Sequence, residues 1–349
     1  MSARPPSAQP ADDPEQSLAA AREAGIHELS ISTPFLVGRV NCYLIEDDPL
    51  TLVDTGPNSA KSLDQLEQAL GERGHRVEDL ELIILTHQHI DHVGLLEILA
   101  RRSGADVAAF HLLGHYLEDF AASAAADDEF SIQTMLRHGV PPDLTTALGA
   151  VGAAFRGFGS SGPVTSPLRD GDRLTLRDRT LSIQHRPGHS PSDTLFWDES
   201  RRILIAGDHL LARISSNPLI SRPLDPATAP ADPVRERSHA LIDYIASMRR
   251  TREVPADLVL GGHGPPVRDP VALIDERFRG YDRRARKILG MLSDGPQTAY
   301  DIASRMWGNV AVTQAFLTIS EVLGHLDLLI ADGKVDEDAE GPVARFSAT

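Results

Sequence analysis

The sequence predicts an α/β fold with a second, smaller domain, and three observations support this prediction. Short apolar stretches typical of buried strands alternate with stretches whose leucines recur at helical spacing. Side chains suited to binding metal follow several of these apolar stretches directly, as expected where strands of an α/β sheet end at a shared site. The length of 349 residues exceeds the usual size of one domain, and 41% hydrophobic residues are enough to form a core.

The first part of the chain changes character after an N-terminal tail. Residues 1–22 contain prolines and few large apolar side chains, so they can bury little surface against the cost of ordering, and we expect them to be disordered. The large domain is predicted for residues 23–274. In its first half we expect strands at 28–32, 40–45, 50–53 and 80–85, and helices at 60–73 and 95–102.

A helical insertion interrupts the alternation of strands and helices. Residues from about 108 to 165 form a long helical pattern with few strand-like stretches, and we expect this insertion to cover the mouth of a site. After the insertion the strand pattern resumes. We expect strands at 173–176, 181–185, 194–197, 202–206 and 257–260, and a helix at 234–251.

Residues 275–349 are predicted to form a small winged-helix-like domain. Three helical stretches are followed by two strand-like runs at 334–338 and 343–346, which indicates three helices and a hairpin. The start of this part is basic, but between residues 313 and 340 a single lysine is outnumbered by seven acidic residues. A DNA-binding surface normally carries the opposite charge. We therefore expect this domain to pack on the rest of the chain or to form a homodimer.

Charge and composition make several classes of function improbable. The formal net charge of −16 at pH 7 disfavours broad adhesion to nucleic acid or to anionic membranes. No apolar run is long enough to span a bilayer, and the first residues lack the apolar centre of a signal peptide, so we expect a cytoplasmic protein. The single cysteine, Cys42, lies in a predicted strand and cannot form an internal disulfide, so we expect a packed thiol.

A histidine-rich turn carries the strongest chemical signal. An apolar run ends at Thr86, and His87, His89, Asp91 and His92 follow within six residues. Imidazole and carboxylate groups suit zinc, and manganese and iron accept the same ligands. His87 and His89 alternate and can bind one ion. Asp91 and His92 fall on the next part of the turn and can bind another, so we expect two divalent ions.

Other predicted strands also end in a candidate ligand or supporting residue. Asp54 follows the strand at 50–53, and His189 lies in a Pro-Gly-His turn. Asp208 and His263 each follow a glycine at the end of an apolar strand. Each of these features is weak alone, since Gly-Asp and Gly-His are ordinary turn sequences. Together with the histidine-rich turn they indicate one site at the ends of several strands.

These motifs resemble the five ordered motifs of the metallo-β-lactamase superfamily. The matching stretches are H-x-H-x-D-H from residue 87, P-G-H from 187, G-D from 207, G-H-G from 262 and, before them, D-T-G from 54. The resemblance covers about residues 27–269. The last motif and the C-terminal part are similar to the lactamase-like protein 2 branch, and the glyoxalase II branch shares the catalytic motifs. The resemblance implies a four-layer αβ/βα sandwich.

The resemblance also implies a role for each candidate ligand. It implies two metal sites that share Asp208 as a bridging ligand, and it implies that Asp54 supports the ligand loop without binding metal. The further ligands are His87, His89 and His189 for the first ion, and Asp91, His92 and His263 for the second.

The implied reaction is hydrolysis by a hydroxide held between the two ions, with Asp91 orienting the nucleophile and assisting proton transfer. A thiolate leaves without help from an acid, so we expect a thioester or a related ester of a small molecule or carrier as substrate. Two alternatives stay open: a metal-dependent phosphodiesterase or endoribonuclease, and a lactonase. Arg213 and Asn217 are candidate substrate contacts. His185 and His209 either orient ligands or simply pack.

Overall fold

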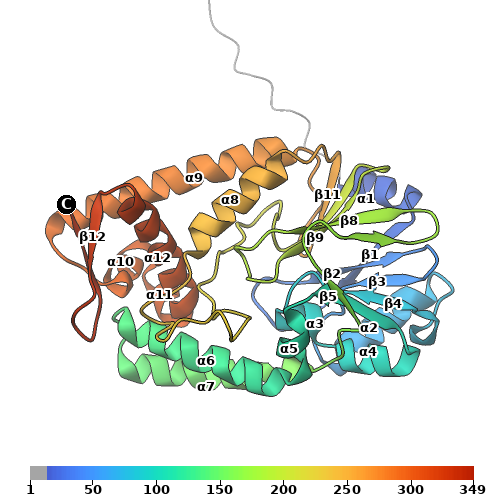
Figure 1. Ribbon diagram of the computed structural model, residues 1–349, viewed down its shortest axis with the longest axis horizontal. Helices are drawn as coiled ribbons and strands as arrows, with labels where there is room; N and C mark the ends of the chain where they lie inside the picture. Colours follow the sequence, from blue (N-terminus) through green and yellow to red (C-terminus); the bar gives the residue numbers. More distant parts are fainter. Residues whose placement is uncertain (1–13) are drawn as a thin grey trace, which may run out of the picture.

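Two β-sheets packed face to face form the centre of the molecule (Figure 1). The computed structural model describes residues 14–349. The first sheet has the order β1 (Ile26–Ile31), β2 (Val40–Ile45), β3 (Thr51–Val53), β4 (Leu82–Ile84), β5 (Asp106–Phe110), β6 (Ser166–Leu168). The second has the order β11 (Leu258–Gly261), β10 (Ile203–Gly207), β9 (Thr194–Asp198), β8 (Thr180–His185), β7 (Arg173–Thr175).

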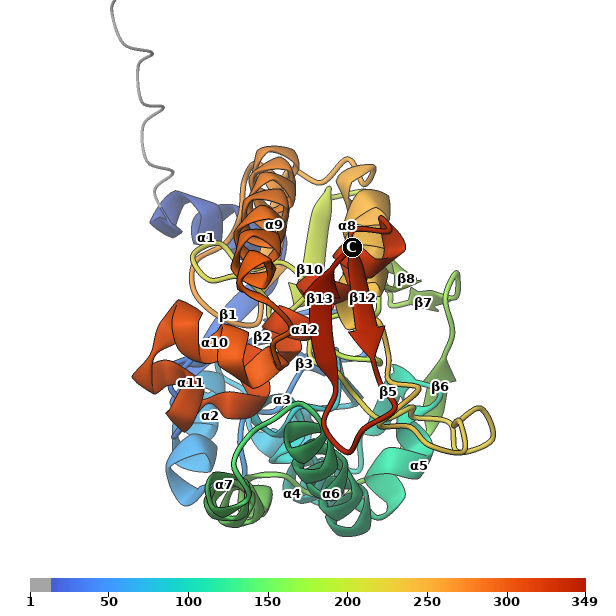
Figure 2. The ribbon, with the colours of Figure 1, turned by 90° about the vertical axis from the view of Figure 1, so that its left-hand side faces the viewer.

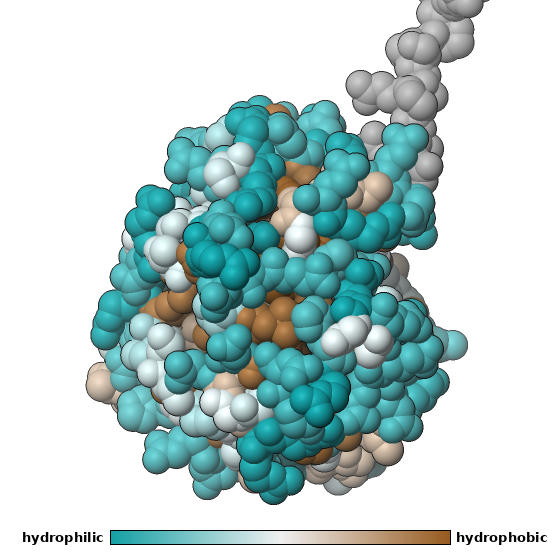
Figure 3. All heavy atoms as spheres, turned by 90° about the vertical axis from the view of Figure 1, so that its right-hand side faces the viewer, coloured by the Kyte–Doolittle hydropathy of each residue, from teal (hydrophilic) through white to brown (hydrophobic). Residues whose placement is uncertain are grey.

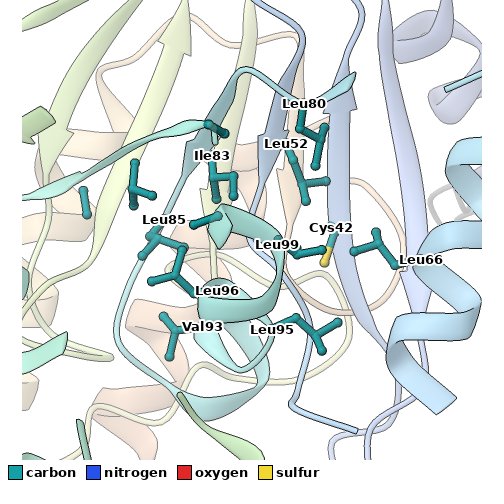
Figure 4. Packing of buried hydrophobic residues seen from close by; sticks show 14 of the residues in the cluster. Cys42, Leu52, Leu66, Leu80, Ile83, Leu85, Val93, Leu95, Leu96 and Leu99 are labelled. Carbon is teal, nitrogen blue, oxygen red and sulfur yellow. The ribbon is translucent and has the colours of Figure 1, made fainter. Parts of the chain in front are cut away.

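Apolar side chains fill the space between the two sheets, and others pack on the outer face of each sheet under the covering helices. Val53 and Ile84 of the first sheet share a buried cluster with Phe196 of the second. On the outer face of the first sheet, Cys42 and Ile83 pack among leucines of the covering helices (Figure 4). Cys42 is a buried free thiol, as predicted.

Helices cover each sheet on its outer side. The first sheet is covered by α2 (Ala60–Gly71) and α4 (Leu96–Ser103), whose buried leucines belong to the same cluster as that sheet. The second sheet is covered by α8 (Ala240–Arg252) and α9 (Pro270–Met291). The predicted order of helix, sheet, sheet and helix is therefore confirmed.

Strand direction brings several strand ends to one edge. β3, β4, β5 and β6 run parallel, so the residues that follow β3 and β4 leave the first sheet on the same side. In the second sheet β10 and β11 are also parallel. The loops after these four strand ends can therefore meet, and α3 (Ile90–Val93) follows β4 within them.

The insertion and the C-terminal part lie beside the sandwich in Figure 1 and in front of it in Figure 2. The insertion contains α5 (Leu113–Glu118), α6 (Phe120–Arg137) and α7 (Pro142–Phe155). The C-terminal part contains α10 (Ala299–Trp307), α11 (Asn309–Thr313), α12 (Ala315–Ala331), β12 (Val335–Asp338) and β13 (Arg345–Ala348). Helix α12 packs against α6, α8, α9 and α10, so it joins the insertion to the second layer of helices.

Some observed boundaries differ from those predicted. Helix α1 (Pro14–Glu23) corrects the expectation of a disordered tail for residues 14–22, while residues 1–13 lie outside the described part of the chain. Strand β5 crosses the predicted start of the insertion at residue 108. Helix α9 begins at Pro270, so the predicted domain boundary at 274/275 falls inside a helix. The side chain of Asp269 caps that helix by accepting a hydrogen bond from the amide of Ala272.

The end of the molecule opposite the C-terminal helices is mostly hydrophilic (Figure 3). Between residues 14 and 349 no helix combines the length and apolar character needed to cross a bilayer.

A buried ion pair joins the two sheets at the turn after β2. Nε of Arg179 lies 2.9 Å from Oδ2 of Asp47, and both side chains are buried. Burial opposes ionisation of Asp47, but hydrogen bonds from Arg179 and from the amides of Asp48 and Asp178 outweigh burial and lower the pKa of Asp47. The pair therefore contributes stability above the ordinary pKa of an aspartate, and this contribution is lost as the pH falls through the lowered pKa.

We expect Arg179→Met to reduce the free energy of unfolding by about 3–5 kcal/mol, because it leaves the buried carboxylate of Asp47 without its partner. Arg177→Met is the matched control in the same hairpin; its side chain is 60% exposed, so the change should stay within about 0.5 kcal/mol. Urea unfolding at pH 7 measures both. In Asp47→Asn the loss of stability below about pH 4 should become less steep. Equal effects of the two arginine variants would contradict the assigned role.

Candidate metal centre

Seven polar side chains from the loops after β4, β8, β10 and β11 converge at the edge of the sandwich. We call them the seven-residue cluster: His87, His89, Asp91, His92, His189, Asp208 and His263. All but the half-buried His89 are buried. Residues more than 170 positions apart in the sequence thus meet at one point, as the positions of the predicted strand ends indicated.

Three histidines form one end of the cluster. Nδ1 of His89 lies 3.0 Å from Nε2 of His87 and 3.0 Å from Nε2 of His189. These three nitrogens are close enough to share one ion, since zinc binds imidazole nitrogen at about 2.0–2.1 Å.

Two carboxylates and two histidines form the other end. Nε2 of His263 lies 3.3 Å from a carboxylate oxygen of Asp91 and 3.3 Å from one of Asp208. Nε2 of His92 lies 3.5 Å from the other oxygen of Asp208. Asp208 also lies 3.7 Å from Nε2 of His189, so its carboxylate stands between the two ends of the cluster.

Backbone carbonyls fix the orientation of two of the rings. Nδ1 of His189 is 3.2 Å from the carbonyl of Asn217, and Nδ1 of His263 is 2.7 Å from the carbonyl of Arg39. A carbonyl can only accept, so each Nδ1 must carry the proton. When either ring is neutral, its lone pair is therefore on Nε2, which faces the cluster, and this is the tautomer that a metal ligand requires.

Asp54 fixes the histidine-rich turn from the neighbouring strand. Its carboxylate accepts hydrogen bonds from the amide and the hydroxyl of Thr86, both at 2.8 Å, and from Nδ1 of His92, also at 2.8 Å. Because the Thr86 hydroxyl donates its hydrogen to Asp54, it can only accept a hydrogen bond from Nδ1 of His87, which lies 3.0 Å away. Asp54 thus sets the tautomers of both His87 and His92.

The electrostatics of the cluster favour a cation. Burial lowers the pKa of His263, but Asp208 and Asp91 outweigh burial and raise this pKa to about 11. Burial likewise lowers the pKa of His92, and Asp54, Asp208 and Asp91 raise it to about 9. Positive charge next to these carboxylates is therefore strongly stabilised. At the other end, burial and the neighbouring His189 lower the pKa of His89 to about 3, so that its ring is neutral and can act as a ligand.

Unpartnered atoms and close backbone approach also fit a metal. Nε2 of His92 and Oδ1 of Asp208 are buried and have no hydrogen-bond partner among residues 14–349, although buried polar atoms normally have one. A Cβ at position 262 would overlap Oδ1 of Asp208, so only glycine fits there. Gly207 has φ +49°, and a Cβ would lie 2.7 Å from Oγ1 of Thr86. The donor set and its surroundings therefore fit divalent cations.

Two residues of β2 support the last ligand loop and were missed in the sequence. Asn41 donates from its side chain to the carbonyls of Gly261 and Gly264, and the hydroxyl of Tyr43 donates to the carbonyl of Gly261 at 2.6 Å. Polar residues at alternate positions of an otherwise apolar strand were the available signal. Their partners lie some 220 residues away, and nothing local in the sequence identifies them.

The remaining predicted site residues have more varied surroundings. Arg213 is exposed. The side chain of Asn217 donates to the carbonyl of Leu317 in α12 at 3.1 Å, so its amide already has a protein partner. His209 lies 2.9 Å from Oγ1 of Thr251.

His185 stacks on a phenylalanine at the edge of the first sheet. Its ring lies 4.0 Å from that of Phe110, with an angle of 13° between the planes, and its Nε2 donates to the carbonyl of Pro191. His185 and His209 thus pack and hold loops, since their ring nitrogens bond to Pro191 and Thr251, outside the seven-residue cluster.

Comparisons with known proteins agree on one family. The model of the metallo-beta-lactamase superfamily matches residues 36–263. The probable metallo-hydrolase YqjP of Bacillus subtilis is 31% identical over 91% of this chain and 96% of its own. The human acyl-coenzyme A thioesterase MBLAC2 is 34% identical over 36% of this chain and 40% of its own. A crystal structure of a metallo-beta-lactamase family protein from Thermus thermophilus has a TM-score of 0.75 and 26% identity, and the match covers 93% of this chain and 99% of that one.

We expect Asp54→Asn to weaken the binding of zinc by about 10–100-fold, because an amide cannot accept all the hydrogen bonds that set the rings of His87 and His92. Competition with a chromophoric chelator measures the affinity without any substrate. Asp64→Asn, at an exposed position in α2, is the control that should bind zinc as the wild type does. Wild-type affinity in Asp54→Asn would show that the ring orientations do not depend on this carboxylate.

Proposed function

Because the chain belongs to the metallo-beta-lactamase superfamily and is therefore a metal-dependent hydrolase, we propose that it hydrolyses a thioester or related ester with two divalent cations bound by the seven-residue cluster. The observation that carries the proposal is the convergence of five imidazole rings and two carboxylates, whose nitrogen and oxygen atoms lie close enough together to hold cations.

The proposed ligand sets follow the two ends of the cluster. One cation would bind to His87, His89 and His189, and the other to Asp91, His92 and His263. Asp208 would bind both, and its position between the nitrogens of His189 and His92 supports this role. Zinc is the proposed metal because imidazole-rich sets suit it, and manganese or iron fit the same donors.

Bound cations would supply Lewis acidity toward an acyl carbonyl and would make a water molecule more acidic. The chain supplies orientation and proton acceptance. Burial raises the pKa of Asp91, but His92 and His263 outweigh burial and lower it, so its carboxylate is ionised at neutral pH. Asp91 can therefore accept a hydrogen bond from the attacking water and receive its proton.

The choice of a thioester is supported by leaving-group chemistry and by one relative. A thiolate is a weak base, so a site without an added acid can release it more readily than an amine. The human relative is named an acyl-coenzyme A thioesterase, although the match to it covers about a third of this chain. We therefore propose an acyl group on a small thiol or carrier as the substrate.

The basic stretch of α9, residues 277–287, offers less support for a nucleic-acid substrate than its sequence suggested. Arg277 donates to backbone carbonyls of the loop after β10, including that of Leu211 at 3.1 Å. Arg284 is paired with Glu321 of α12. Two of the basic side chains thus serve internal contacts. With a net charge of −16, the chain is a weaker candidate for a phosphodiesterase or endoribonuclease than for an esterase.

We expect the zinc-loaded protein to hydrolyse thioesters faster than lactones or phosphodiesters, because a thiolate needs no acid to leave. A panel of the three substrate classes, run on protein of measured metal content, tests this. His87→Ala should abolish whichever activity belongs to the cluster. If a ribonuclease activity disappears in His87→Ala and no thioester turns over, the nuclease is the better assignment.

We expect Asp208→Ala to lose one or both metal ions and to lower kcat/KM by at least about 100-fold, because the carboxylate lies between the two ends of the cluster. Metal content by mass spectrometry and thioester turnover are measured on the same sample. Asp64→Ala is the exposed control. Full occupancy with unchanged turnover would contradict the bridging role.

A further inference from the structure

Exposed apolar side chains lie on several segments that hydrogen bonds connect to the seven-residue cluster. Large hydrophobic residues are usually covered in a folded protein, and a group of exposed ones marks a binding surface. We call this group the apolar rim: Leu36, Val37, Phe155, Ile214, Val310 and Leu317. Leu36, 90% exposed, is the extreme case.

One side of the rim begins at the ligand His263. Nδ1 of this ring donates to the carbonyl of Arg39, and Leu36 and Val37 precede Arg39 in the same β1–β2 loop. Aromatic contacts join this loop to the insertion. The ring of Phe35 lies 5.5 Å from that of Phe155 at the end of α7, edge to face. Leu36 therefore remains exposed close to the cluster while its neighbour Phe35 is packed.

The other side of the rim begins at the ligand His189. Nδ1 of His189 donates to the carbonyl of Asn217, whose side chain donates to the carbonyl of Leu317 in α12. Helix α11, which carries Val310, directly precedes α12. Figures 1 and 2 both show α11 above α7. The C-terminal helices and the insertion thus lie on the same side of the molecule, where α12 contacts α6.

The loop after β10 completes the rim. Ile214 lies six residues after Asp208, and its carbonyl accepts a hydrogen bond from Arg277 of α9 at 3.1 Å. The backbone of Ile214 is thereby fixed while its side chain is 44% exposed. The β1–β2 loop, the insertion, the loop after β10 and the C-terminal helices thus carry exposed apolar side chains, and hydrogen bonds or chain connections link them to the loops of His263, His189 and Asp208.

We propose that the apolar rim binds the hydrocarbon chain of the acyl group, so that the preferred substrates are thioesters of medium to long acyl chains; this inference rests on the proposed function. The acyl carbonyl must lie at the cluster, and the chain attached to it must leave through the surrounding surface. That surface carries leucine, isoleucine, valine and phenylalanine, which gain by covering hydrocarbon. A membrane is the weaker occupant, since the net charge of −16 opposes anionic lipid.

Chain length is the variable that tests the rim. With one leaving thiol and acyl chains of increasing length, kcat/KM of the wild type should rise by about twofold to fourfold for each added methylene until the rim is covered. Alkyl thioethers of the same thiol cannot be hydrolysed. Their binding to the zinc-loaded protein, measured by calorimetry, should tighten over the same range of lengths.

The decisive variants are Leu36→Ser and Leu317→Ser. Each should reduce the ratio of long-chain to short-chain binding by about tenfold, since a polar side chain replaces one that covers hydrocarbon. Val271→Ser is the matched control: Val271 is 37% exposed, as Leu317 is, but lies in the first turn of α9. This control should keep the wild-type ratio.

The possible outcomes distinguish a failure of the apolar rim as an acyl-binding site from a failure of the proposed hydrolase function. Thioether binding that tightens with chain length, in protein that hydrolyses no thioester, supports the rim and overturns the proposed function. Hydrolysis that is independent of chain length, with unchanged ratios in Leu36→Ser and Leu317→Ser, overturns the rim. Mass photometry and flotation with neutral phosphatidylcholine vesicles complete the test. Variants that lose a dimer or lose vesicle binding without a change in chain-length preference also overturn the rim as an acyl site.

Discussion

Burial of Asp91 and Asp208 among five imidazole rings is the constraint on which the arrangement of the surrounding loops depends. An unpaired buried carboxylate is costly, and two of them near each other repel. The chain places His263 at 3.3 Å from both and His92 at 3.5 Å from one, so positive charge is favoured between them. A sandwich of two sheets suits this arrangement because the loops at its edge can approach from both sides.

Hydrogen bonds to acceptors outside the cluster fix the orientation of three of its imidazole rings. The carbonyls of Arg39 and Asn217 each take the Nδ1 proton of one ring, and Asp54 takes that of His92. Each outer acceptor comes from a different segment of the chain: the β1–β2 loop, the loop after β10 and the end of β3. Ring orientation therefore depends on the correct docking of both sheets, and the centre cannot form on either sheet alone.

The sequence was sufficient to predict which residues converge in the seven-residue cluster, but several of the groups that orient them depend on tertiary contacts. His87 and His92 could be identified because they follow an apolar strand at close spacing, and His263 because glycines flank it. Asn41 was missed because the carbonyls that its side chain contacts, those of Gly261 and Gly264, are brought beside it only when the sheets dock. Strand β5 was missed because the run D-V-A-A-F contains alanines and does not alternate between apolar and polar residues. A strand that is buried on both faces has no such alternation. The start of α9 had a local signal, since Asp269 and Pro270 form a cap and a first turn.

The C-terminal helices take part in the construction of the site and do more than pack beside it. The loop that carries Asp208 leaves β10 without regular structure, so its carbonyls need donors from elsewhere. Arg277 of α9 donates to the carbonyls of Leu211 and Ile214, and Asn217 at the end of the loop is tied to Leu317 of α12. The carbonyl of Asn217 in turn orients the ring of His189. A sandwich without α9 and α12 would leave this loop unsupported on the side opposite the sheet, and the same helices supply part of the surface beside the ligands. Helices α9 and α12 thus support both the orientation of the His189 ring and the loop beside it.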